Sequence, residues 1–119
     1  KVSVKVTFKP EHSDAFKFTY IFGYRISIEN QSIYTVQLLR RKWNIFDSCG
    51  MRREVEGEGV VGQRPVIEPG TTYEYESFCD LSTDIGAMKG YYCLTRQVDN
   101  KKITAEIPEF PLIPPFRLN

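Results

Sequence analysis

The chain has 119 residues, a length that fits one domain with a normal hydrophobic core. Lys and Arg number 16 against 15 Asp and Glu, and this net charge of +1 argues against nucleic acid or an anionic membrane as a general electrostatic partner. No apolar run approaches the length of about 20 residues that a membrane-spanning helix needs. We therefore predict a single domain over residues 1–119, without a membrane span.

The cysteines and the first residues bear on the compartment of the protein. Three cysteines are present, an odd number, and none are spaced as Cys-x-x-Cys. The segment from Lys1 to Val6 alternates polar and apolar residues, unlike a signal peptide, and the lack of an initiating Met indicates that the chain is trimmed at its start. These features predict free thiols in a reducing cytoplasm.

The first part of the chain alternates apolar and polar residues with the period of two that is typical of β-strands. One strand is predicted over 2–8 and a longer one over 18–29. The apolar residues of the longer strand share one face: Tyr20, Phe22, Tyr24, Ile26 and Ile28. A third strand begins near Val36, and a change of parity at Leu38 and Leu39 indicates a bulge.

The second half of the chain predicts four further strands, at 52–56, 72–79, 87–96 and 102–107. Turn residues stand between them, as at Asp99-Asn100. The tail from Pro108 to Asn119 holds four prolines, and since proline donates no backbone hydrogen bond, we predict that the tail does not join a regular central ladder.

About seven strands without helical periodicity predict an all-β fold, an immunoglobulin-like or fibronectin type III-like β-sandwich. Trp43 on the third strand and Tyr91-Tyr92-Cys93 on the sixth are similar to immunoglobulin landmarks. The second strand, however, has no cysteine that could pair with Cys93. Cys93 is therefore predicted to be a buried free thiol that behaves as a small hydrophobe.

A glycine motif, Gly57-Glu58-Gly59-Val60-Val61-Gly62, has the Gly-x-Gly-x-x-Gly spacing of a phosphate-binding loop. In dinucleotide-binding folds such a loop leads into a helix, whose N-terminus supplies amide donors. Here Val60 and Val61 favour extended structure, and Pro65 prevents a helix. The motif therefore favours a bend between strands, with phosphate binding as the alternative.

Basic residues around this motif complete the candidate phosphate site: Gly57, Gly59, Gly62, Arg40, Arg41, Arg53 and Arg64. If the third and fourth strands form a hairpin, the arginines converge, and together with the glycine amides they would hold a phosphate in a backbone nest. The favoured alternative is cross-strand pairing with glutamates such as Glu54 and Glu56, which leaves a neutral surface.

The residues that metal sites and catalytic sites need are sparse. One histidine and no paired cysteines predict no preformed metal site, and no cofactor is expected. His12-Ser13-Asp14 holds the residue types of a triad, but adjacency in sequence does not build one. We assign no catalytic residue; a hydrolase would need an acid or base at the glycine loop, where Glu58 is the candidate.

Taken in order, these motifs resemble the ApaG family (the DUF525 domain) of the free-standing bacterial type. The matching stretches are Tyr24–Asn30, Val36–Trp43, Val55–Pro65, Ile67–Gly70, Tyr73–Tyr75, Gly86–Tyr92, Ile107–Phe110 and Pro115–Asn119. The glycine motif matches in full. Lys42 departs from the family pattern, in which a histidine or tyrosine commonly precedes the Trp.

The resemblance implies a fibronectin-like sandwich and an association with cobalt tolerance and magnesium efflux. Related domains in F-box proteins and in a polymerase-interacting protein resemble protein-binding modules. The resemblance thus predicts a non-enzymatic protein-interaction module with a protein partner, linked to Co²⁺ and Mg²⁺ homeostasis. The alternative is a sensor of phosphate, pyrophosphate or a dinucleoside polyphosphate. Homo-oligomers are compatible with either function.

Overall fold

The computed structural model describes residues 1–14 and 17–114. Within them the chain forms eight β-strands and one 3-10 turn, and the predicted all-β class is confirmed. The elements are β1 (Val2–Phe8), η1 (Pro10–His12), β2 (Tyr20–Glu29), β3 (Val36–Asp47), β4 (Arg52–Glu58), β5 (Val66–Ile67), β6 (Thr72–Leu81), β7 (Gly86–Arg96) and β8 (Lys102–Leu112).

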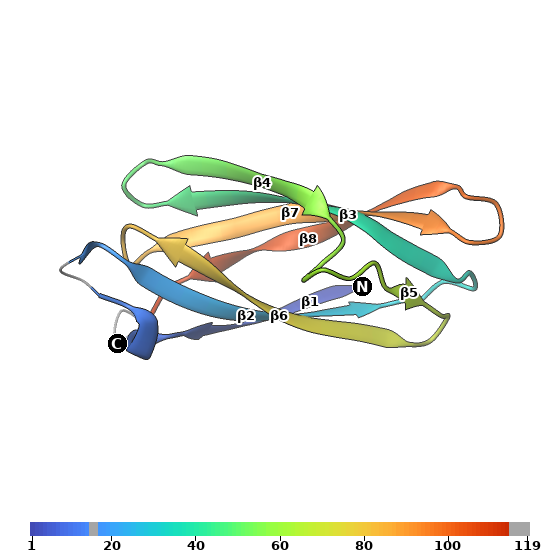
Figure 1. The fold of residues 1–119 in the computed structure, drawn as a ribbon, viewed down its shortest axis with the longest axis horizontal. Coiled ribbons are helices and arrows are strands. Elements are labelled where there is room, and N and C mark those ends of the chain that lie inside the picture. Colours follow the sequence, from blue (N-terminus) through green and yellow to red (C-terminus); the bar gives the residue numbers. More distant parts are fainter. Residues whose placement is uncertain (15–16, 115–119) are drawn as a thin grey trace.

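Two antiparallel sheets pack face to face as a sandwich (Figure 1). One sheet has the strand order β1-β2-β6, and the other has the order β4-β3-β7-β8, with the short β5 beside β3. On one side of the sandwich β1 packs against β8, the edge strand of the other sheet. The edge strands β6 and β4 therefore lie on the opposite side.

The core forms because the alternate apolar residues of both sheets point between them. The largest fully buried side chains come from both sheets and from two positions outside the strands, Val60 and Pro114: Tyr92, Phe22, Ile26, Leu38, Ile67, Met88, Leu112, Val60 and Pro114. Trp43 packs edge-on against Tyr24 of the facing sheet, with ring centroids 5.5 Å apart. The faces predicted from alternation in the first two strands are thus the faces that the core buries.

Two buried tyrosines join the sheets by their hydroxyl groups. Tyr75 of β6 and Tyr92 of β7 form a hydrogen bond in the core. Burial raises the pKa of both phenols, so both stay neutral at any physiological pH. The pair satisfies two polar groups that would otherwise be costly to bury.

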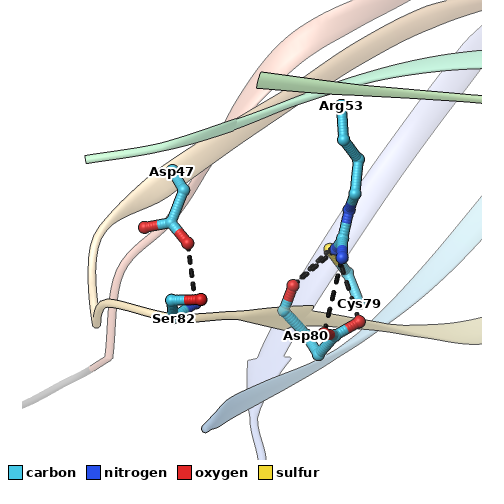
Figure 2. A network of polar contacts seen from close by, with 5 residues as sticks. All are labelled: Asp47, Arg53, Cys79, Asp80 and Ser82. Carbon is cyan, nitrogen blue, oxygen red and sulfur yellow. Dashed lines mark hydrogen bonds and ion pairs between the residues drawn. The ribbon is translucent and has the colours of Figure 1, made fainter. Parts of the chain in front are cut away.

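Asp47, at the end of β3, is a buried carboxylate that ties β3 to the turn between β6 and β7 (Figure 2). Its Oδ2 accepts a hydrogen bond from the Ser82 amide at 2.6 Å, and its Oδ1 accepts one from the Thr83 hydroxyl. Burial alone would raise the pKa of Asp47, but hydrogen bonds from Thr83, Ser82 and Cys49 hold that pKa below its usual value.

The last strand extends past the predicted 102–107, but as the edge strand of its sheet it forms no central ladder. β8 continues to Leu112, and both Phe110 and Leu112 are buried. Proline is tolerated because β8 is an edge strand and because the β7–β8 ladder shifts register next to Pro108, between the pairs Met88–Phe110 and Gly90–Ile107. Residues 115–119, which include the last family match, lie outside the described residues.

Two smaller predictions need correction, and one is confirmed. The second strand begins at Tyr20 rather than Phe18, because Phe18 has a φ of +53° and turns the chain. Cys93 is half-buried rather than buried, since Tyr92 and Leu94 on either side of it take the inward positions. The predicted bulge is present: the β3–β7 register shifts between Leu38 and Arg40.

We expect Asp47→Asn to lower the free energy of unfolding by about 2 kcal/mol at neutral pH, since hydrogen bonds to a charged group contribute about 1.5–3 kcal/mol. The folded-state pKa is depressed, so this contribution is present above the unfolded pKa of about 3.9 and is lost as the pH falls through the folded value. Urea unfolding of the variant and the wild type at pH values on both sides of this range measures the difference in the free energy of unfolding. An equal difference from wild type at every pH would contradict the charged clamp.

Candidate functional site

The predicted hairpin of the third and fourth strands is present and carries most of the candidate site. β3 and β4 pair antiparallel, with Arg41 opposite Gly57 and Trp43 opposite Val55. β4 runs through Gly57 to Glu58, so the first glycine of the motif lies inside a strand and not after it.

Gly57 makes room for the side chain of Arg41. A Cβ added at Gly57 would lie 2.8 Å from Arg41 Nη1. Without that Cβ, the guanidinium passes over the strand and donates to the backbone oxygens of Glu58 at 3.1 Å and of Gly59 at 2.9 Å. The first glycine of the motif therefore serves a side chain of its own fold.

The other two glycines build a tight turn. Gly59 has a φ of +63°, and a Cβ there would lie 2.1 Å from the Gln63 carbonyl oxygen. Val60 and Gln63 exchange two backbone hydrogen bonds, of 2.8 and 2.9 Å. Val61 and Gly62 between them both have positive φ, the pattern of a type I′ turn. Positive φ is unusual for a β-branched residue, so Val61 is strained.

The amides of this loop already have acceptors at three positions. Gly59 donates to the Leu39 carbonyl oxygen at 2.7 Å, and Val60 and Gln63 donate to each other. A backbone nest needs successive amides that point at one ligand. Of the three glycines in the predicted nest, Gly59 thus directs its amide at Leu39.

Three of the four predicted arginines meet at Glu58. Arg40 Nη1 lies 3.9 Å from the Glu58 carboxylate, Arg64 forms an ion pair with it, and Arg41 donates to the Glu58 carbonyl oxygen. The cross-strand pairing considered from the sequence is also present. Lys42 Nζ lies 3.8 Å from Glu54 and 3.3 Å from Glu56.

Arg53, the fourth predicted arginine, joins the two sheets (Figure 2). From β4 it reaches Asp80 of β6, with Nη2 3.3 Å from Oδ1, and its guanidinium lies 3.6 Å from Cys79 Sγ. Burial opposes the positive charge, yet Asp80 and Cys79 keep the pKa of Arg53 raised. Burial also raises the pKa of Cys79 to about 11, so this cysteine is a neutral thiol at pH 7.

A groove between β4 and β6 was not predicted from the sequence. It has a volume of about 280 Å³ and lies on the side of the sandwich that Arg53 and Asp80 bridge. Its lining includes Tyr24, Arg41, Trp43, Val55, Ser77 and Phe78. No sequence pattern predicts the groove, because its walls are strands that are distant in the chain and belong to different sheets.

Among residues 1–14 and 17–114, β4 has a neighbouring strand on one side only, because it is the edge of its sheet. Hydrogen bonds from Asp47 N to Met51 O and from Gly59 N to Leu39 O fix which residues face β3. By the alternation of antiparallel ladders, Arg53 and Val55 bond to β3. The backbone groups of Arg52, Glu54 and Glu56 face away; we call these three positions the free edge.

The residues weighed for catalysis and metal binding are placed as follows. The Ser13 hydroxyl donates to the Lys9 carbonyl oxygen at 2.7 Å and accepts from the Ile21 amide at 2.9 Å. His12 Nε2 lies 3.9 Å from the Glu11 carboxylate on an exposed turn. Ser13 therefore fixes local structure. Over residues 1–14 and 17–114, no three His, Cys, Asp or Glu side chains gather as metal ligands would.

Known proteins match this chain over almost its whole length. The family model for the ApaG domain, DUF525, matches residues 10–96. Protein ApaG of Anaeromyxobacter dehalogenans is 45% identical over all 119 residues and 93% of its own length, and that of Nitrosospira multiformis is 44% identical over 114 residues and 89% of its own length. The crystal structure of an ApaA protein from Bordetella pertussis superposes with a TM-score of 0.92 at 39% identity, covering 97% of this chain and 93% of that one.

The turn predicts unequal effects of alanine at two glycines. Gly59→Ala should cost about 3 kcal/mol of unfolding free energy, because it adds a clash with a carbonyl oxygen to the strain of positive φ. Gly62→Ala is the matched control, with positive φ but open space around its Cβ, and should cost about 1 kcal/mol. Urea unfolding compares them, and equal losses would contradict this account of the turn.

Proposed function

Because the chain belongs to the ApaG family, we propose that it is a non-enzymatic protein-interaction module of the bacterial cytoplasm, and that it binds an extended segment of a partner protein along β4. The observation that carries this proposal is the free edge. Backbone donors and acceptors at Arg52, Glu54 and Glu56 face away from the sheet, and an added strand satisfies such groups.

The side chains on the two faces of β4 define the partner segment. On the outer face, Glu54 and Glu56 share one cation, Lys42, so the neighbouring strand should carry Lys or Arg there. On the inner face, Val55 is 36% exposed beside the groove. Apolar side chains of the partner fit this face. The segment is therefore basic on one face and apolar on the other.

The link to Co²⁺ and Mg²⁺ homeostasis forms part of the same proposal and is indirect. Metal-ligand clusters of three residues are absent from the described part of the chain, which also contains no helix long and apolar enough to cross a membrane. The module then acts on cation levels by binding a protein that handles the ions.

A proline at Glu54 tests the free edge. The Glu54 amide faces away from β3, so Glu54→Pro removes an outward donor and no bond of the sheet. We expect Glu54→Pro to lose most of the partner that the tagged wild-type protein captures from native lysate. Glu54→Ala, which keeps the amide and removes the carboxylate, should retain most of it. Quantitative mass spectrometry of the captured proteins measures both.

Two outcomes decide against this use of β4. Equal capture by the two Glu54 variants and wild type would place the interaction elsewhere. A second copy of the chain is the competing occupant, shown by a concentration-dependent mass in light scattering that Glu54→Pro abolishes.

In a deletion strain, Glu54→Ala but not Glu54→Pro should restore growth in cobalt if the same interaction underlies cation tolerance.

We also propose a second candidate, a phosphate or polyphosphate sensor at the glycine loop, on the observation that Arg40, Arg41 and Arg64 converge on Glu58. Glu58 would compete with an anionic ligand there. Glu58→Gln should therefore strengthen pyrophosphate binding about tenfold, as expected when a charged competitor is removed. Amide NMR titration measures this, and no saturable shift in either protein would remove the candidate.

A further inference from the structure

The groove between β4 and β6 contains a buried hydrogen-bond donor without an acceptor. Trp43 lines the groove and is 2% exposed. Among the described residues, no acceptor lies within hydrogen-bond reach of its Nε1. Most buried donors in proteins are paired, because an unpaired one costs free energy. An unpaired indole nitrogen beside a groove indicates that an acceptor is supplied from outside the chain.

The cation beside this donor also lacks a carboxylate. Arg41 donates to two backbone oxygens and, within the described residues, forms no ion pair. It lines the same groove as Trp43 and lies two residues away on the same face of β3. Burial raises the pKa values of the Tyr24, Tyr75 and Tyr92 hydroxyl groups, and the positive charge of Arg41 offsets part of that rise.

The remaining polar lining adds donors and little negative charge. Tyr24 and Ser77 both line the groove and each carries a hydroxyl group. Arg53 and Asp80, which also line it, neutralise each other. The lining thus has a net positive charge from Arg41, an unpaired N–H and two hydroxyls. A carboxylate is the group that matches these features, since it accepts several hydrogen bonds and carries the opposite charge.

We propose that the groove receives the carboxylate of an Asp or Glu side chain from the partner segment that pairs with β4. This inference rests on the proposed function and specifies the partner further. In a strand added to the free edge, alternate side chains point to the inner face of β4, which carries Val55 and leads to Arg41 and Trp43. An acidic residue at an inward position, between apolar ones, therefore enters the groove.

A designed peptide tests this inference. The probe is the acetylated and amidated sequence Lys-Val-Lys-Glu-Lys-Val-Lys, which places lysines beside Glu54 and Glu56 and the central Glu in the groove. Its control has Gln in place of Glu. Trp43 is the one Trp of the chain, so its indole N–H gives a single cross-peak in a ¹H–¹⁵N spectrum. This cross-peak reports on the donor directly.

We expect the Glu peptide to bind about tenfold more tightly than the Gln peptide and to move the indole cross-peak downfield, as a charge-assisted hydrogen bond does. General attraction to the outer glutamates predicts the opposite order, because the Gln peptide is the more cationic. Trp43→Phe and Arg41→Gln should each abolish the preference for Glu. Arg25→Gln, which removes an exposed ion pair with Glu76 on the other sheet, should leave the preference unchanged.

Each other outcome has a defined meaning. If both peptides bind equally and shift β4 amides, the proposed carboxylate in the groove is overturned and the interaction module stands. The same holds if neither peptide binds while Glu54→Pro still abolishes partner capture. If neither binds and Glu54→Pro has no effect on capture, both proposals are overturned. The comparison of the two peptides on wild-type protein remains decisive even if the Trp43 or Arg41 variant unfolds.

Discussion

The two sheets of this sandwich are closed by strands on one side and by a side-chain bridge on the other. β1 packs against β8 on the closed side, while β4 and β6 stay apart and are connected there by Arg53 and Asp80. A sandwich built this way keeps its core through the facing side chains and has an open side between two edge strands. The groove and the free edge both lie on that open side.

Most of the fold follows from alternation, and the errors arise where neighbours decide the outcome. Strands such as β1 and β2 are readable because one face enters the core at every second residue. The last strand continues past Pro108, because a proline at an edge strand and next to a register shift breaks no ladder. Whether β8 lies at an edge depends on the order of strands, which local sequence does not contain. Cys93 is half-buried and not buried as predicted, because Tyr92 next to it holds the inward position.

The candidate site was predictable in its residue types and not in its contacts. The sequence shows glycines and arginines close together, and the hairpin does bring three arginines to Glu58. It does not show that Gly57 accommodates Arg41, or that Arg53 turns to the opposite sheet. The unpaired Trp43 nitrogen depends on the positions of all surrounding acceptors, and no pattern in the sequence reports an acceptor that is missing.

The alternation along β4 has a consequence for how this family can diversify. Arg53 and Gly57 face inward, where Arg53 joins the two sheets and Gly57 makes room for Arg41, whereas Glu54 and Glu56 face outward and pair with Lys42. Mutations at the outward set cost the fold little, since surface substitutions usually change stability by less than about 0.5 kcal/mol. Descendants of one ancestral domain can therefore acquire different binding preferences by drift at alternate positions of a single strand, while selection for foldability preserves the positions between them.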